Sequence, residues 1–322
     1  MKRQTFQNRA NLLADVAEMY YCKGKTQAEI SKSIGVTRSM VSRMLTEARE
    51  SGIVEIYIRR PLQHDTGLES MLKEKYELKE IFVVVSGFVD REKLIRLLGN
   101  AGAQMLTQFL APHIVLGLTW GTTISATVDA INVKEYTPIK VVELVGAMGA
   151  RLMEYDGHDI VTRIARKLGG EAYYLNAPFL CQTADIAKAL INTQGVRETI
   201  ALGKKVDIAL LGIGTTRPEY SSFYQAGYVS RDEITELRRA GAIGDVCGLH
   251  FDIEGQPACE SFCERLVTIR RGDLLKIPVR LAVAGGEWKA DAILGALRSK
   301  LVNALVVDNI TAKKVLELEK TR

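Results

Sequence analysis

Hydrophobic positions along the chain change their spacing near residue 60. Before this point, apolar residues recur every three or four positions, which is typical of amphipathic helices. From residue 81 onward, short uninterrupted runs of Val, Ile and Leu alternate with helical patterns. Such runs are typical of parallel strands that helices cover on both faces. The pattern predicts a small helical domain followed by a large, doubly wound, mostly parallel α/β domain.

The second part of the chain gives the clearest element boundaries. Strands are expected at 81–85, 114–118, 139–145, 172–175, 206–213, 266–270, 279–284 and 304–307, and helices at 91–110, 122–131, 158–168, 231–240, 289–300 and 311–319. A further helix is expected at 65–78, where Leu68, Met71 and Leu72 share a face that we expect to contact a partner subunit. The predicted domains are therefore 1–60, a linker and oligomerisation helix at 61–80, and 81–322.

The N-terminal domain contains a stretch, 26–45, with the spacing of a helix-turn-helix. Ile30 lies on the inner face of the first helix, and Gly35 follows where the tight turn favours a residue that tolerates positive φ. Thr37 can cap the second helix, and Leu45 belongs to the buried side of that helix. The alternative is a helical hairpin in an ordinary core.

Charge distinguishes these two interpretations. Residues 1–60 contain 11 Lys or Arg and 6 Asp or Glu, whereas the rest of the chain contains 32 of each kind. The whole positive excess therefore lies in the segment with the motif, as binding to phosphate requires. The second helix would enter the major groove of double-stranded DNA. The residues predicted to contact DNA are Gln27, Lys32, Thr37, Arg38, Ser39, Ser42 and Arg43.

The pattern of residues 53–58 approaches the alternation that is typical of a strand, and two arginines follow this segment. A strand after a helix-turn-helix suggests a winged helix whose wing contacts the phosphate backbone. A plain linker strand is the alternative.

Glycine-rich turns follow several of the predicted strands, and ligands bind at such strand ends in doubly wound folds. The turn 117–123 leads from a strand through Gly121 to Thr122 and Thr123, which open a helix. Backbone N–H groups, two hydroxyls and the helix dipole would suit an anion such as phosphate, and a plain structural turn is the alternative. Lys289 lies in a first helical turn, where the dipole disfavours a cation, so we expect it to serve a bound anion.

A second candidate is a carboxylate in the glycine-rich stretch 241–248. Asp245 would suit the hydroxyl groups of a sugar, although stabilisation of a turn explains it equally well. The five cysteines are scattered, and Cys259 and Cys263 near His250 lack the spacing of a metal site. We therefore expect no metal and no cofactor.

Composition and length exclude other classes. With 47% hydrophobic and 25% charged residues, nothing indicates disorder. No apolar stretch approaches the ~20 residues of a membrane span, and no apolar run follows the basic N-terminus. A cytoplasmic protein that does not bind membranes is expected.

Together with segments 27–30, 42–45, 117–123, 209–214, 241–248 and 284–290, these features resemble the SorC-type family of sugar-responsive transcriptional regulators over essentially the whole chain. The resemblance implies an effector domain with the fold of sugar-phosphate isomerases, deaminases and CoA-transferases, which binds a sugar or sugar phosphate. It also implies a dimer or tetramer, and a closed symmetric oligomer implies a pseudo-palindromic operator. The implied effector-binding residues are Gly117, Gly121, Thr122, Thr123, Gly146, Gln182, Gly214, Asp245 and Lys289.

The alternative function is a sugar-phosphate isomerase or related enzyme that carries a DNA-binding head. Such an enzyme needs a carboxylate base near the C1–C2 protons of the sugar, usually with a second acid or base. Asp245 is present, but no convincing partner motif accompanies it. We therefore predict a regulator without enzymatic activity.

Overall fold

The computed structural model describes residues 2–54, 62–87, 89–132, 138–148 and 155–321. The chain divides into two compact units, Met1–Pro61 and Leu62–Arg322, and each is described by itself. The predicted wing strand, 53–58, lies outside the described residues except for Ile53 and Val54. Within the described parts, no helix combines the length and the apolar character needed to cross a membrane.

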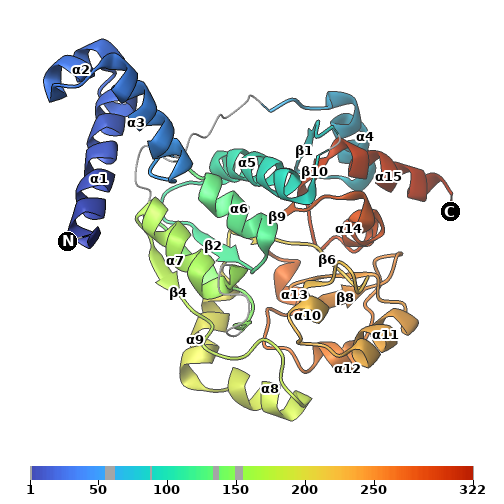
Figure 1. Cartoon of the computed structure of the whole chain (residues 1–322). Coiled ribbons are helices and arrows are strands. Elements are labelled where there is room, and N and C mark those ends of the chain that lie inside the picture. The colour runs from blue at the N-terminus through green and yellow to red at the C-terminus, as the bar shows by residue number, and fades with distance from the viewer. Residues whose placement is uncertain (1, 55–61, 88, 133–137, 149–154, 322) are drawn as a thin grey trace. The chain divides into compact units, whose positions relative to one another are not determined.

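The N-terminal unit is helical. Its elements are α1 (Lys2–Ala17), the π-helical turn η1 (Glu18–Cys22), α2 (Gln27–Ile34) and α3 (Arg38–Glu50) (Figure 1). Apolar side chains from α1, α2 and α3 form one small core, with buried Leu13, Val16, Ala17, Ile30, Val41, Met44, Leu45 and Ala48. The helix spacing read from the sequence is confirmed by this core.

The described residues of the second unit form a seven-stranded parallel sheet with the order β1-β10-β9-β5-β2-β3-β4. Its strands are β1 (Glu80–Val84), β2 (Val115–Leu118), β3 (Lys140–Glu143), β4 (Glu171–Tyr173), β5 (Ile208–Leu211), β9 (Val279–Val283) and β10 (Ala304–Asp308). From β2 the chain winds outward through β3 to β4, and from β5 it winds the other way through β9 to β10. The winding reverses between neighbours β2 and β5, which makes the fold doubly wound as predicted.

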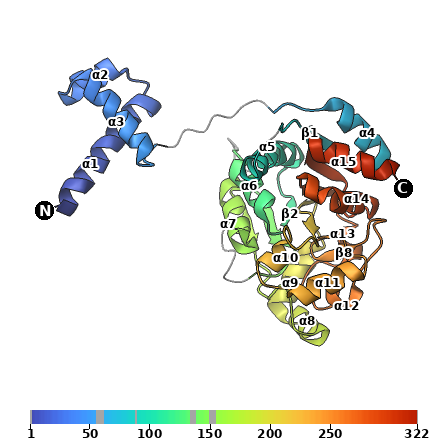
Figure 2. The same cartoon turned by 45° about the vertical axis from the view of Figure 1, so that its right-hand side comes forward.

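Helices cover both faces of this sheet. On one face α5 (Arg91–Phe109), α6 (Thr122–Ala130) and α7 (Gly157–Leu168) lie side by side (Figures 1 and 2). The other face carries α4 (Thr66–Tyr76), α9 (Gln194–Gly203), α14 (Ala290–Arg298) and α15 (Asn309–Lys320), and α8 (Ala184–Ile191) precedes α9. Each face has its own apolar core, which is why the strands read as uninterrupted apolar runs.

A small antiparallel sheet was not predicted. In the described residues it contains β6 (Gly214–Thr215), β7 (Gly244–Val246) and β8 (Leu249–Phe251). Around it lie α10 (Ser222–Gln225), α11 (Arg231–Arg239), α12 (Glu260–Cys263) and α13 (Arg271–Leu274). These strands have two or three residues each, too few to show a period in the sequence.

The strand predicted at 266–270 is wrong. This segment joins neither sheet, although it is extended: Leu266 bridges Leu180 and Thr268 bridges Val145. The amides of Val267 and Ile269 donate to Phe179 O and Leu144 O, which lie in loops after the sheet strands. A run of apolar residues that is buried between loops has the same sequence pattern as a buried strand.

We expected Leu68, Met71 and Leu72 in the helix at 65–78 to contact a partner subunit. For two of these three residues this prediction is wrong. Leu68 and Leu72 are 8% and 1% exposed and pack into the core of the α/β unit, where α4 contacts β1 and α15. Met71 lies on the outer side and is 50% exposed.

Replacing Leu72 by Ala should lower the free energy of unfolding by about 2–5 kcal/mol, because a fully buried side chain leaves a cavity. Met71→Ala, one position away, should change it by less than about 0.5 kcal/mol. Urea denaturation of both variants measures this. Equal losses, or a change in oligomeric state from Leu72→Ala at unchanged stability, would show that α4 serves an interface instead.

Candidate functional site

The helix-turn-helix is set by local hydrogen bonds. Thr26 and Glu29 form a reciprocal cap at the start of α2, in which the Thr26 amide donates to Glu29 Oε2 at 2.8 Å. This bond lowers the pKa of Glu29. Gly35 ends α2 with a φ of 72°, and Thr37 Oγ1 accepts from the Met40 amide at the start of α3. The turn at Gly35 and the cap at Thr37 follow the sequence prediction, whereas the reciprocal cap of Thr26 and Glu29 was not predicted.

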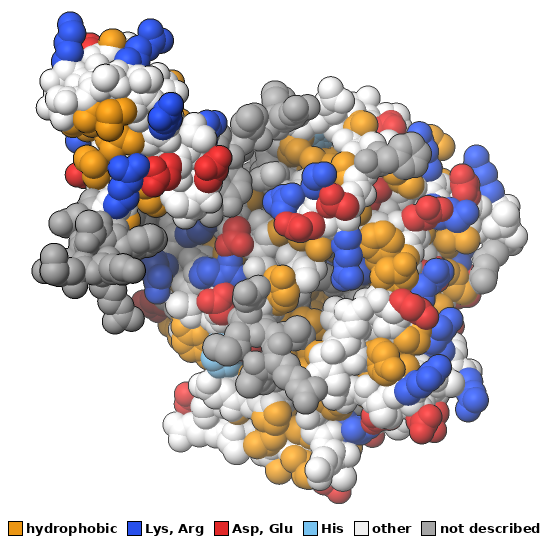
Figure 3. Space-filling view, viewed as in Figure 1, with side chains coloured by type: hydrophobic (Ala, Val, Ile, Leu, Met, Phe, Trp, Pro, Cys, Tyr) orange, Lys and Arg blue, Asp and Glu red, His pale blue; other side chains and the backbone are white. Residues whose placement is uncertain are grey.

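The face of α3 that points away from its core carries the predicted DNA-reading side chains, which are exposed: Arg38, Ser39, Ser42 and Arg43. Arg38 and Arg43 form no ion pair with other described residues. Lys32 of α2 is exposed and Gln27 is half-buried. Lys and Arg side chains stand out on the surface of the N-terminal unit (Figure 3). This face offers two guanidinium groups without an ion-pair partner among the described residues, together with the hydroxyls of Ser42 and of Ser39, which lies 3.0 Å from Thr37 Oγ1.

The α/β unit has a pocket where the winding of its sheet reverses, which we call the switch-point pocket. It has a volume of about 360 Å³. Its described lining residues are Arg91, Glu92, Ile95, Trp120, Gly121, Thr122, Tyr155, Ser222 and Gln225. They come from the start of α5, the loop after β2, the start of α6, the segment before α7, and α10. The pocket therefore lies at the carboxyl edge of the sheet, where doubly wound folds bind ligands.

The N-terminus of α6 opens into this pocket. Its cap residue is Gly121, whose φ of 137° is one that L side chains rarely adopt. Because glycine has no side chain, the cap residue cannot accept a hydrogen bond from the first amides of the helix. Thr122 lines the pocket. Thr123 does not, because its hydroxyl donates to Val283 O at 2.7 Å and ties α6 to the end of β9. Of the two predicted hydroxyls, the structure brings one to the pocket.

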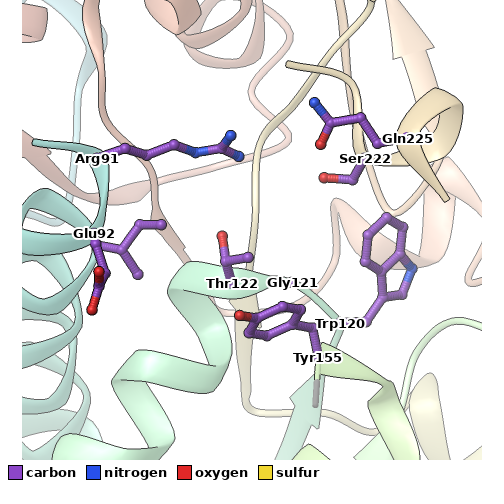
Figure 4. A pocket seen from close by; sticks show the side chains of 9 residues that line it. Arg91, Glu92, Trp120, Gly121, Thr122, Tyr155, Ser222 and Gln225 are labelled. Carbon is purple, nitrogen blue, oxygen red and sulfur yellow. The ribbon is translucent and has the colours of Figure 1, made fainter. Parts of the chain in front are cut away.

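Figure 4 shows how the polar side chains of the pocket face one another. The Arg91 guanidinium reaches across from α5, the Thr122 hydroxyl points into the space beside it, and Ser222 and Gln225 lie on the opposite side. Glu92 also lines the pocket, but its carboxylate pairs with Arg96. Arg91 forms no ion pair with the described residues. An unpaired guanidinium therefore faces an uncapped helix N-terminus.

An aromatic group closes one side of the pocket. The ring centroid of Phe223 in α10 lies 5.4 Å from that of Trp120 and 5.4 Å from that of Phe179. Phe179 and Phe223 are buried, while Trp120 remains half-buried. This packing fixes α10 against the loop after β2.

Lys289 lies next to the pocket rather than on its lining. It ends the short turn η3 (Glu287–Lys289), and its ammonium donates to Ile213 O at 2.7 Å, just after β5. Burial lowers the pKa of Lys289 to about 8; the Asp245 carboxylate opposes this shift and the Arg91 guanidinium adds to it. Two cations therefore lie close together at the strand ends. Lys289 therefore has interactions within the chain, with Ile213 O and with the Asp245 carboxylate, and these do not depend on a bound anion.

Asp245 lies in a strand, whereas the sequence suggested a glycine-rich turn. It belongs to β7, is 6% exposed, and its Oδ2 accepts from the Gly248 amide at 2.9 Å. Burial raises its pKa, and His250, the Gly248 amide and Lys289 act against that shift. Asp245 is not among the described lining residues, and its interaction with this region is electrostatic: its carboxylate favours the charged form of Lys289. Among the described residues no group of three or more His, Cys, Asp or Glu is arranged to hold a metal ion.

The remaining predicted residues lie outside the described lining of the pocket. Gly117 lies within β2, and Gly146 lies against the backbone at 177–179, where a Cβ would be 2.6 Å from Ala177 O. Gly214 lies against the Asp245 carboxylate, 1.9 Å from where its Cβ would be, so it makes room for that group. Gln182 is exposed.

Sequence reasoning missed five polar lining residues: Arg91 and Glu92 at the start of α5, and Tyr155, Ser222 and Gln225 elsewhere. Arg91 opens the helix after the first predicted strand, so its place at a strand end was a usable signal. Tyr155, Ser222 and Gln225 lie in segments with no periodic pattern, and folding alone brings them to the pocket.

Comparison with known proteins agrees with this architecture. The family model described as "Putative sugar-binding domain" matches residues 60–317, and the chain belongs to this family. The chain is 28% identical to the deoxyribonucleoside regulator of Bacillus subtilis (strain 168), over 95% of this chain and 97% of that protein. It is 31% identical to the transcriptional regulator LsrR of Escherichia coli O9:H4 (strain HS), over 94% of each.

A solved structure extends the likeness to both units. The full-length sorbitol operon regulator SorC from Klebsiella pneumoniae superimposes with a TM-score of 0.73 at 28% identity, covering 96% of this chain and 99% of that one. The predicted SorC-type resemblance is confirmed. The protein is a DNA-binding transcriptional regulator under the control of a sugar effector.

The lowered pKa of Lys289 predicts a pH dependence of stability. Between pH 8 and 10 the unfolded chain, with an ordinary lysine pKa of 10.5, binds more protons at this residue than the folded chain does. Stability of the wild type should therefore rise with pH relative to Lys289→Met, by on the order of 2 kcal/mol over this interval. Denaturation at pH 7.5, 8.5 and 9.5 measures the difference.

Lys188→Met is the matched control, because Lys188 is exposed on α8. Its curve should run parallel to that of the wild type. A parallel curve for Lys289→Met as well would show that the ammonium is not buried.

Proposed function

We propose that the effector is a phosphorylated sugar and that it binds in the switch-point pocket. The observation that supports this proposal most directly is the N-terminus of α6, which has no side-chain cap and opens into the pocket opposite the Arg91 guanidinium (Figure 4). The first amides of a helix and its dipole attract an anion. An arginine adds charge-assisted hydrogen bonds, which are roughly twice as strong as neutral ones.

In this proposal the phosphate lies between the start of α6 and Arg91, with Thr122 donating its hydroxyl. Lys289 contributes charge from the adjacent strand end, where Ile213 O holds its ammonium and the Asp245 carboxylate favours its charged form. Glycines 117, 121, 146 and 214 shape the backbone around the site. The roles proposed from the sequence for Thr123 and Gln182 would require an arrangement other than the one described.

Occupancy of the pocket is proposed to change operator affinity in a homo-oligomer. A dimer or tetramer presents its helix-turn-helix units in two-fold pairs, which suits a pseudo-palindromic operator. A coupling free energy of ~1–3 kcal/mol between the two sites changes DNA affinity by about 5- to 150-fold. The effector needs only this differential binding to act as a switch.

We expect no turnover of sugar phosphates. The carboxylate that an isomerase would use as a base, Asp245, is enclosed and bound to the Gly248 amide. Glu92, the described carboxylate that lines the pocket, is paired with Arg96. Product analysis after incubation with pentose and hexose phosphates tests this expectation.

Arg91→Ala should abolish the response to the effector and leave operator affinity without effector unchanged. The guanidinium contacts only the ligand, and a lost charged hydrogen bond weakens binding by about 10- to 100-fold. A thermal-shift screen of pentose and hexose phosphates identifies the compound that stabilises the protein most. DNA titrations with and without that compound then measure the response.

Lys93→Ala is the matched control on the same helix, since Lys93 pairs with the exposed Asp90 and neither residue is among the described lining residues. It should respond as the wild type does. Lys289→Ala should lose most of the response. Normal responses from both Arg91→Ala and Lys289→Ala would refute the anionic site.

On the DNA side, Arg43→Ala should cost ~1–3 kcal/mol on the operator and relax specificity at one base pair, because a guanidinium on the outer face of α3 can read a guanine edge. Lys32→Ala, on α2, should weaken all DNA sequences alike and flatten the salt dependence. Fluorescence titrations on operator and random DNA measure both. Equal losses on both DNAs for Arg43→Ala would contradict base reading.

A further inference from the structure

The two sides of the switch-point pocket differ in charge. Arg91 and the start of α6 form a cationic side, and Lys289 adds to it from behind. The opposite side consists of Ser222 and Gln225 from α10 (Figure 4). A ligand that spans the pocket therefore meets a cation at one end and uncharged polar groups at the other.

The hydrogen-bonding groups that α10 presents to the pocket are uncharged and suit a neutral part of a ligand. Gln225 Nε2 donates to Glu219 O at 2.6 Å, which fixes the amide and leaves its oxygen as an acceptor. Ser222 Oγ has no hydrogen-bond partner among the described residues. An amide oxygen and a hydroxyl match the donors and acceptors of sugar hydroxyl groups.

No cation on this segment is free to bind a second phosphate. The charged residues of 216–225 are Arg217 and Glu219. Arg217 is committed to Asp291 at 2.8 Å, and neither residue is among the described lining residues. A second anionic group at this end would lose its hydration without gaining a counter-charge.

The segment is also held rigidly, as discrimination between ligands requires. Ser221 Oγ accepts from the Tyr224 amide and caps α10, and Tyr220 stacks on Trp288 with ring centroids 5.0 Å apart. Together with the Arg217–Asp291 pair, these contacts fasten α10 to the start of α14, beside Lys289.

We propose that Ser222 and Gln225 are specificity-determining residues that select an effector with a single anionic end and an uncharged, hydroxyl-bearing end. A sugar monophosphate fits this description and a sugar bisphosphate does not. The inference rests on the proposed function, because the anionic end must lie at Arg91 and α6.

Calorimetric titration of the full-length protein tests the proposal. The probes are inorganic phosphate, a panel of pentose 5-phosphates and hexose 6-phosphates, and fructose 1,6-bisphosphate beside fructose 6-phosphate. The wild type should bind at least one monophosphate more tightly than both inorganic phosphate and the bisphosphate. Gln225→Ala and Ser222→Ala should each raise the Kd of that monophosphate by about tenfold and leave the Kd of inorganic phosphate within about twofold.

Two further variants complete the test. Gln104→Ala, exposed on α5, should behave as the wild type does. Gln225→Lys should shift the ratio of bisphosphate to monophosphate affinity toward the bisphosphate by about tenfold or more. This gain of binding also shows that the variant is folded.

The outcomes separate the two proposals. Binding of sugar phosphates with no change in these ratios in any α10 variant overturns the assignment of Ser222 and Gln225, and the anionic site stands. Tighter binding of the bisphosphate by the wild type does the same. If no phosphate compound binds, or if Arg91→Ala binds them all normally, the proposed function fails and the inference fails with it.

Discussion

The reversal of winding between β2 and β5 is the constraint from which the site follows. Strands on either side of this point connect in opposite directions, so no crossover covers their carboxyl ends. The loop after β2 therefore reaches the pocket at Gly121, and α6 begins there without a side-chain cap from the described residues. Everything else in the pocket, from Arg91 to α10, surrounds this helix end. The fold thus brings a helix N-terminus without a side-chain cap to the pocket before any charged side chain is considered.

Charge then makes the site selective. The Arg91 guanidinium contributes to the lowered pKa of Lys289, because two positive charges repel each other. Asp245 offsets part of this repulsion but is enclosed and cannot reach a ligand in the pocket. A phosphate between the cations would supply the missing negative charge, whereas a neutral sugar would leave the repulsion unchanged. In the proposed function, binding of a phosphorylated effector would therefore relieve this repulsion.

The amino-acid sequence predicted the parts of this account that have a periodic or local signal. Buried apolar runs placed seven parallel strands, and the turn at Gly35 with the cap at Thr37 placed the two helices of the DNA-binding motif. The turn at Gly121 also pointed to the strand end where the described pocket lies. Local signals failed where burial comes from tertiary packing: the run 266–270 pairs with loops, and Leu68 and Leu72 face their own core.

The composition of the pocket was predictable only in part, for the same reason. Thr122 and Arg91 follow directly after strands, so topology brings them to one edge. Ser222 and Gln225 reach the pocket because Phe223 packs on Trp120 and Tyr220 stacks on Trp288. Such contacts between distant segments have no spacing in the sequence. Glycine-rich turns follow several strands in the sequence, yet Gly121 is the one glycine among the described lining residues of the pocket.

Hydrogen exchange of backbone amides tests the central claim, that the effector binds at the switch point of the sheet, most directly. The full-length protein is compared with and without a saturating sugar phosphate, and exchange is resolved by peptide. The account predicts slower exchange in peptides that cover 119–126 and 216–226, since a phosphate accepts from the first amides of α6 and the sugar contacts α10. Protection confined to other segments of the α/β unit, with both of these peptides unchanged, would contradict it.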